Sequence, residues 1–212
     1  MNLPNALTIA RIVATPAIAI LPFSNSSGLR LCAFVLFVLA AITDYIDGYL
    51  ARSRKEETDL GRLLDPFADK ALLVGTLIAM YLLAPRFPFI TPIGPIALPL
   101  WIVIVVLGRE VFMTVYRQAA ARRGVVISAI GPAKWKTGLQ LFWQGSAYCW
   151  FWATTLAAER HWENQSAWRA FAMFNGTVGT LVMCGAVFLT IYSLVIYLRD
   201  FRGVFATGNH RS

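Results

Sequence analysis

Six long apolar stretches, separated by shorter polar segments, make up most of the chain. A helix of about 20 apolar residues crosses the hydrocarbon core of a bilayer, and each stretch is close to that length. The pattern therefore predicts an all-α, polytopic membrane protein with six transmembrane helices in a single domain, residues 1–212. The stretches cover residues 5–23, 29–50, 64–84, 97–118, 137–157 and 171–198. The proline-rich segment 85–96 is expected to be a plain connector.

The composition supports a membrane protein. Hydrophobic residues make up 58% of the chain and charged residues 14%, and the mean hydropathy is +0.60. These values are too apolar for an ordinary soluble domain. The three cysteines, Cys32, Cys149 and Cys184, lie in different apolar stretches and lack the spacing of a disulfide framework or a metal site.

Basic residues are concentrated in alternate loops, 51–63 and 117–136, and in the tail from 199. The positive-inside rule therefore places both termini and these loops on the cytoplasmic side, which predicts a multi-pass protein of the inner (cytoplasmic) membrane. The net charge of +8 suits contact with anionic membrane lipids. A nucleic-acid partner is not expected, because the basic residues lie at membrane edges and no nucleic-acid-binding motif is present.

Four aspartates, Asp44, Asp47, Asp65 and Asp69, lie within or at the rims of two neighbouring apolar stretches. An unpaired charge there costs several kcal/mol, so their placement favours a function. The spacings i, i+3 and i, i+4 put each pair on one helix face, and the short loop between the stretches predicts antiparallel helices whose carboxylates converge. An all-oxygen site favours Mg²⁺ or Mn²⁺, and this much negative charge favours two divalent ions. The alternative is a solvated helix end with ordinary caps.

Small and basic residues accompany the aspartates. Gly48, Ala51 and Gly61 clear one side of each helix for a close approach, and Arg52 offers a cation to a phosphate. An ion transporter could also keep acids within the membrane, but it would not need small residues at these spacings.

Two further polar clusters are candidates for binding. Thr8 and Arg11 share a helix face near Asn2, and Arg11 either pairs with an acid or a phosphate or extends to the membrane surface. The second cluster is predicted to form a cationic pocket beside the carboxylates, sized for a phosphate monoester, although cytoplasmic anchoring is an alternative for its basic residues. This basic cluster contains Arg109, Arg117, Lys134 and Lys136, with Glu110 next to Arg109.

The acidic motif resembles the signature of the CDP-alcohol phosphotransferase family. The matching positions are Asp44-x-x-Asp47-Gly48-x-x-Ala51-Arg52-x8-Gly61-x-x-x-Asp65-x-x-x-Asp69. The resemblance implies a membrane enzyme in which the aspartates are metal ligands. It also implies that Asp69 is a metal ligand or the catalytic base, and that Gly48, Ala51, Arg52 and Gly61 hold the nucleotide of the donor together with Asn2, Thr8 and Arg11.

The basic cluster and the opening motif resemble the branch of this family that uses sn-glycerol 3-phosphate as acceptor. The resemblance implies transfer of a phosphatidyl group from CDP-diacylglycerol, with the acceptor phosphate held by Arg109, Arg117, Lys134 and Lys136, and a homodimer. A cardiolipin synthase or another CDP-diacylglycerol-dependent phosphatidyltransferase is the alternative within the family.

Overall fold

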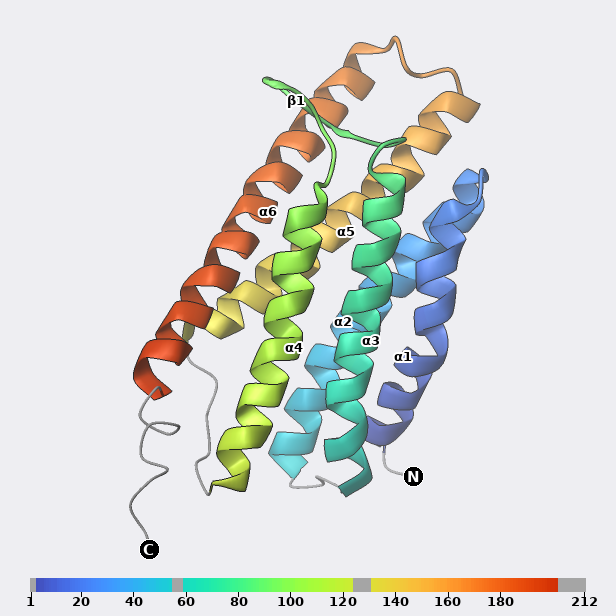
Figure 1. Cartoon of the computed structure of the whole chain (residues 1–212). Coiled ribbons are helices and arrows are strands. Elements are labelled where there is room, and N and C mark those ends of the chain that lie inside the picture. Colours follow the sequence, from blue (N-terminus) through green and yellow to red (C-terminus); the bar gives the residue numbers. More distant parts are fainter. Residues whose placement is uncertain (1–2, 55–58, 124–130, 202–212) are drawn as a thin grey trace, which may run out of the picture. The chain divides into compact units, whose positions relative to one another are not determined.

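The computed structural model describes residues 3–54, 59–123 and 131–201. Six long helices account for most of them (Figure 1). The helices are α1 (Leu3–Ile20), α2 (Ser27–Arg54), α3 (Asp59–Leu83), α4 (Leu100–Arg122), α5 (Gly131–Glu159) and α6 (Ser166–Phe201). A short 3₁₀ turn, η1 (Leu21–Phe23), follows α1. Each predicted apolar stretch is thus helical, and the protein is mostly α-helical.

Three segments of the described chain are long and apolar enough to cross a membrane: Asn5–Phe23, Ser27–Asp44 and Ser166–Arg199. They support the prediction of a membrane protein. Helices α3 and α4 are also of membrane-crossing length, but they carry charged residues along their length, such as Asp69 and Arg109. The count of six spans and the orientation of the termini therefore stay predictions.

The segment 85–96, predicted as a plain connector, joins α3 to α4 along the chain and contains a short hairpin that the sequence did not predict. Strands β1 (Phe89–Thr91) and β2 (Gly94–Ile96) form an antiparallel hairpin in which Thr91 pairs with Gly94. Gly94 adopts a φ of 118°, which a glycine allows without strain. The Thr91 hydroxyl donates a hydrogen bond to the Gly94 carbonyl (2.6 Å). The prolines exclude a helix here, and the tight turn closes the hairpin.

The described residues form two compact units, each considered by itself. The first comprises Met1–Leu98 and Gln144–Thr180, and the second Pro99–Trp143 and Leu181–Ser212. The first unit therefore holds α1, α2, α3, the hairpin, the end of α5 and the start of α6. The second holds α4, the start of α5 and the rest of α6.

In the first unit, α1 packs against both α2 and α3. Gly75 lets α3 approach α1 closely, because a Cβ at this position would lie 3.3 Å from the Ala19 methyl group. The Tyr148 hydroxyl donates a hydrogen bond to the carbonyl of Ile18 (3.1 Å), and the Tyr148 ring stacks on Phe37 at 5.3 Å. These contacts bring α1, α2 and α5 into one apolar core.

The hairpin packs against α6 within the same unit. A Cβ at Gly176 would overlap the backbone of Ile90, and one at Gly179 would lie 3.0 Å from Phe89 Cζ. The two glycines, one turn apart, therefore make room on α6 for strand β1.

Arg30 joins the turn after α1 to α5. Its side chain is fully buried, and its Nε donates to the carbonyls of Pro22 (2.9 Å) and Ser24 (2.8 Å). One guanidinium nitrogen, Nη1, donates to the Phe151 carbonyl (3.3 Å), and the guanidinium lies 4.3 Å from the Phe87 ring centroid. Because its hydrogen bonds go to carbonyls of the chain itself and to the Thr155 hydroxyl, Arg30 has a structural role.

The second unit has its own core on α4, α5 and α6. Val106 and Ala186 are fully buried, and Trp143 is 1% exposed. Gly185 brings α6 close to α5, since a Cβ there would lie 3.3 Å from Leu139 Cδ1. This core carries the buried polar cluster described below.

Candidate active site

An arginine on α1 holds two aspartates of the acidic motif. Arg11 Nη1 donates a hydrogen bond to Asp69 Oδ1 on α3 (3.0 Å), and the same nitrogen is hydrogen-bonded to Asp44 Oδ1 on α2. The Arg11 side chain is 1% exposed, whereas those of Asp44 and Asp69 are 38% and 56% exposed. Both carboxylates thus meet at one buried cation and remain accessible from the surface.

This arrangement decides between the two alternatives for Arg11. A cation in an apolar helix must be paired or must extend to the membrane surface. Arg11 is buried and paired with two acids, so the prediction that it pairs with an acid is confirmed. Thr8, one turn earlier on α1, is also buried, at 1% exposure. The expected convergence of the two halves of the acidic motif is confirmed for Asp44 and Asp69.

The remaining residues of this motif are placed only by their backbone. Four of them, Asp47, Gly48, Ala51 and Arg52, lie on α2, and Gly61 and Asp65 lie on α3. Their side chains lie outside the part of the chain that the structure describes, as does Asn2.

The acidic motif fits a divalent metal as far as it is described. Asp44 Oδ1 and Asp69 Oδ1 come from different helices and contact one positively charged nitrogen, Arg11 Nη1. Carboxylate oxygens are the ligands that Mg²⁺ and Mn²⁺ prefer. Among the described side chains no group of three or more His, Cys, Asp or Glu residues is arranged to hold a metal. The side chains of Asp47 and Asp65 lie outside this described set.

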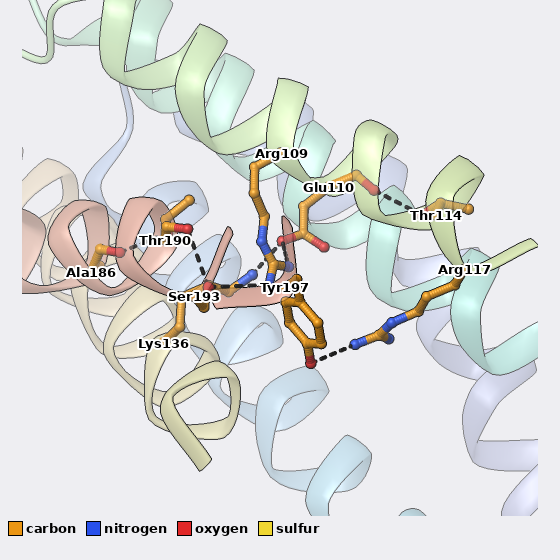
Figure 2. Close-up of polar contacts among 9 residues, drawn as sticks. All are labelled: Arg109, Glu110, Thr114, Arg117, Lys136, Ala186, Thr190, Ser193 and Tyr197. Atoms are coloured by element: carbon orange, nitrogen blue, oxygen red, sulfur yellow. Dashed lines mark hydrogen bonds and ion pairs between the residues drawn. The ribbon is translucent and has the colours of Figure 1, made fainter. Parts of the chain in front are cut away.

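The basic cluster is built around Glu110 (Figure 2). Glu110 Oε1 accepts a hydrogen bond from the neighbouring Arg109 Nη1 (2.9 Å) and another from Lys136 Nζ on α5. Arg109 Nη2 also donates to Ser193 Oγ on α6 (3.2 Å). Arg109 and Lys136 are 7% and 3% exposed. The structure thus brings together two predicted phosphate ligands, Arg109 and Lys136, and Glu110.

The charges of this cluster do not balance. Arg109 and Lys136 are cations, and among the described side chains Glu110 is the one acid in contact with them. A buried excess of positive charge is costly and favours binding of an anion. The Glu110 side chain is 21% exposed, so the cluster reaches the surface at its centre.

Arg117 lies two turns beyond Arg109 on α4 and points toward α6. Its Nη2 donates a hydrogen bond to the Tyr197 hydroxyl (3.1 Å), and its guanidinium lies 5.5 Å from the centre of the Tyr197 ring (Figure 2). The Arg109 guanidinium lies 6.0 Å from the same ring. Arg117 is thus held beside the cluster, while the side chain of Lys134 lies outside the described residues.

Sequence reasoning missed Ser193 and Tyr197 as partners of the basic residues. They stand i, i+4 on α6, and both are fully buried. Their pattern could have indicated this role: two polar side chains at helical spacing within an apolar stretch need hydrogen-bond partners inside the protein. The acidic motif belongs to the first unit and the basic cluster to the second, so the expectation that they adjoin stays a prediction.

The described helices are those of an integral membrane protein, and two clusters of charged side chains, one around Arg11 and one around Glu110, lie among them. Comparison with known families gives a match to the CDP-alcohol phosphatidyltransferase family over residues 1–192. The chain belongs to this family, as its acidic motif predicts.

Three relatives have names that refer to the synthesis of phosphatidylglycerophosphate or to the same phosphatidyl transfer. A probable phosphatidylglycerophosphate synthase of Mycobacterium tuberculosis is 32% identical over 215 residues, which cover 98% of this chain and 87% of the relative. A CDP-diacylglycerol–glycerol-3-phosphate 3-phosphatidyltransferase of Rickettsia bellii is 41% identical over 141 residues, covering 66% of this chain and 71% of the relative. A similarly named Arabidopsis thaliana protein is 31% identical over 207 residues, covering 94% and 79%.

Proposed function

We propose that this chain is a phosphatidylglycerophosphate synthase. It transfers the phosphatidyl group of CDP-diacylglycerol to the primary hydroxyl of sn-glycerol 3-phosphate and releases CMP. The observation that carries the choice of acceptor is the excess positive charge of the Arg109–Glu110–Lys136 cluster. A phosphate monoester supplies the missing negative charge, and an acceptor without a phosphate does not. Family membership and the names of the relatives support the reaction type.

The divalent ions are Mg²⁺ or Mn²⁺, and two are proposed. Asp44, Asp47, Asp65 and Asp69 hold them, because the acids are hard oxygen ligands on two neighbouring helices. When bound, such ions stabilise the charge that develops on the attacking and leaving oxygens. Arg11 contributes a fixed positive charge between Asp44 and Asp69.

Asp69 is the proposed catalytic base. Its carboxylate is half exposed, so an acceptor hydroxyl can reach it, and it accepts the proton as that hydroxyl attacks. A bond forms between the acceptor oxygen and the phosphorus that bears the diacylglycerol group. The bond from this phosphorus to the CMP oxygen breaks, and CMP leaves.

The chain's other site residues bind the two substrates. The donor nucleotide is held by Gly48, Ala51, Arg52 and Gly61, with Asn2, Thr8 and Arg11 on the first helix. The acceptor phosphate is held by Arg109, Arg117, Lys134 and Lys136. Arginine suits this role because its planar guanidinium can donate two hydrogen bonds to one phosphate.

The proposal includes the membrane topology and the location of the enzyme. The whole chain forms one family domain with six membrane spans, and both termini and the active site face the cytoplasm of the inner membrane. There the water-soluble acceptor is available. The family resemblance further favours a homodimer.

A panel of acceptors tests the function. Purified protein receives CDP-diacylglycerol, Mg²⁺ and one acceptor at a time: sn-glycerol 3-phosphate, glycerol, inositol 1-phosphate or phosphatidylglycerol. The proposal is supported if glycerol 3-phosphate is the only one of these acceptors that gives CMP release. Equal release with phosphatidylglycerol would assign the protein as a cardiolipin synthase instead.

A further inference from the structure

Gln140 places an unused hydrogen-bond donor in the second unit. It lies on α5 and is 3% exposed, and its amide Nε2 is buried without a hydrogen-bond partner in the described part of the chain. Buried polar groups are nearly always paired, because an unpaired one loses its hydrogen bonds to water without replacement. An amide in this state can donate a hydrogen bond to a partner that comes from outside the chain, and its position decides whether a substrate can supply one.

The position of Gln140 relates this donor to the basic cluster. Gln140 follows Lys136 by four residues, so the two side chains lie on one face of α5, about 6 Å apart along the helix axis. The direction of that face is fixed by Lys136, whose ammonium group contacts Glu110. Arg109, on the other side of Glu110, also has a buried Nε without a partner among the described groups. The second unit thus contains two hydrogen-bond donors without described partners, Arg109 Nε within the basic cluster and Gln140 Nε2 one turn from Lys136.

The chemistry of the two donors differs. The guanidinium of Arg109 is charged and suits a phosphate oxygen, whereas the carboxamide of Gln140 is neutral and suits a hydroxyl oxygen. In glycerol 3-phosphate the C2 hydroxyl lies a few ångströms from the phosphorus. Lys136 and Gln140 are separated by one helical turn, a distance similar to that between the phosphorus and the C2 hydroxyl of the acceptor.

We propose that Gln140 donates a hydrogen bond to the C2 hydroxyl of the acceptor and thereby selects acceptors that carry this hydroxyl. The inference rests on the proposed function, since it assumes that the basic cluster holds the acceptor phosphate. A site built to hydrogen-bond a substrate hydroxyl rejects the analogue that lacks it, because the amide is then left buried and unpaired.

The test compares sn-glycerol 3-phosphate with 1,3-propanediol monophosphate, which lacks only the C2 hydroxyl. Wild-type enzyme is expected to prefer glycerol 3-phosphate by on the order of 10-fold to 100-fold in kcat/KM. Gln140→Leu should reduce this ratio to about 3-fold or less, through a lower kcat/KM for glycerol 3-phosphate, with the KM of CDP-diacylglycerol unchanged. Gln144→Leu is the matched control, because Gln144 is also buried, has an Nε2 without a partner among the described groups, and lies one turn further along α5.

Three results would overturn the inference. The first is an equal kcat/KM of the wild-type enzyme for the two acceptors. This measurement does not depend on whether any variant folds. Another is an unchanged ratio in folded Gln140→Leu, and a third is a loss of preference in Gln144→Leu instead. If wild-type enzyme releases CMP with neither acceptor, the proposed function fails and this inference fails with it. If wild-type enzyme releases CMP with both acceptors at equal rates, the role of Gln140 is overturned, but the proposed function is not.

Discussion

Arg11 on α1 and Asp69 on α3 are joined by a hydrogen bond of 3.0 Å between Nη1 and Oδ1. The arginine is buried, whereas the aspartate side chain is 56% exposed. Because the same nitrogen also contacts Asp44, one cation holds two carboxylates from different helices together. The pairing ties the first helix to the acidic motif.

Replacing Arg11 should therefore increase the dependence of stability on metal. Arg11→Ala leaves two carboxylates close together without their cation, and we expect a loss of about 1–3 kcal/mol in stability. A divalent ion can restore the missing positive charge. The melting temperature of Arg11→Ala should thus rise more on addition of Mg²⁺ or Mn²⁺ than that of wild type, with Arg11→Lys in between. An equal rise in all three proteins would contradict this role of Arg11.

Asp69→Asn tests the assignment of the base. The amide cannot accept the proton of the acceptor hydroxyl, so turnover should fall by on the order of 10²-fold or more. Donor binding, measured by CDP-diacylglycerol titration, should persist. Glu163→Gln, at an exposed acid between α5 and α6, is the control and should retain full activity. A near wild-type rate in Asp69→Asn would exclude Asp69 as the base.

Arg109→Ala tests the acceptor site. Loss of a charge-assisted contact to phosphate should raise the KM of glycerol 3-phosphate by the equivalent of about 2–3 kcal/mol, with little change in the KM of the donor. Lys136→Ala should act in the same direction. Arg122→Ala, at an exposed basic residue at the end of α4, is the matched control. Donor and acceptor KM values that rise together would instead indicate a purely structural Arg109–Glu110 pair.

Arg30→Lys should affect stability and not substrate binding. The lysine keeps the charge but cannot reproduce the guanidinium hydrogen bonds to Pro22, Ser24 and Phe151. We expect a loss of about 2–3 kcal/mol in stability at unchanged KM values. Arg86→Lys is the control, because Arg86 is exposed and its guanidinium lies 5.8 Å from the Phe87 ring. A large change in either KM would contradict the structural role.

Glu159 should make stability depend on acidic pH. It lies beyond the apolar stretch 137–157 and accepts hydrogen bonds from the hydroxyl and the backbone N–H (2.8 Å) of Ser27. These hydrogen bonds hold the pKa of Glu159 below its usual value of 4.5. A carboxylate with a lowered folded-state pKa stabilises the fold above its unfolded pKa, and this contribution is lost as the pH falls through the folded pKa.

The melting temperature of wild type should therefore decrease more steeply than that of Glu159→Gln as the pH falls below about 4.5. Thermal unfolding in detergent between pH 6 and pH 3, in roughly half-unit steps, measures the difference. Parallel curves for the two proteins would show that the Ser27–Glu159 contact does not contribute.

The apolar pattern predicted which segments are helical but not where the helices end. Helix α5 begins at Gly131 instead of residue 137, and α2 continues to Arg54 instead of residue 50. The reason is that apolar composition reports the part of a helix suited to the membrane, whereas backbone hydrogen bonds continue into polar sequence. The hairpin was missed because the prolines exclude a helix without indicating which backbone groups pair.

The site was predictable where the cost of a buried charge constrained it. For Arg11 the sequence left two possibilities, pairing with an acid or a phosphate or extension to the membrane surface, and the nearby aspartates were the available acids. The contact between Lys136 and Glu110 joins residues far apart in sequence, and a basic residue near a membrane edge needs no such partner. The sequence did not indicate a role for Gln140, because an unpaired amide can be recognised only once its surroundings are known.

The most direct test of the central claim is the mass of the lipid made from CDP-diacylglycerol and sn-glycerol 3-phosphate. Purified enzyme in lipid nanodiscs is incubated with both substrates and Mg²⁺, with an EDTA-treated sample and Asp69→Asn alongside. We predict a metal-dependent lipid that retains the acceptor phosphate, formed in equal amounts with CMP and nearly absent from both controls. Formation of a lipid without that phosphate, or of CMP without a new lipid, would contradict the proposed reaction.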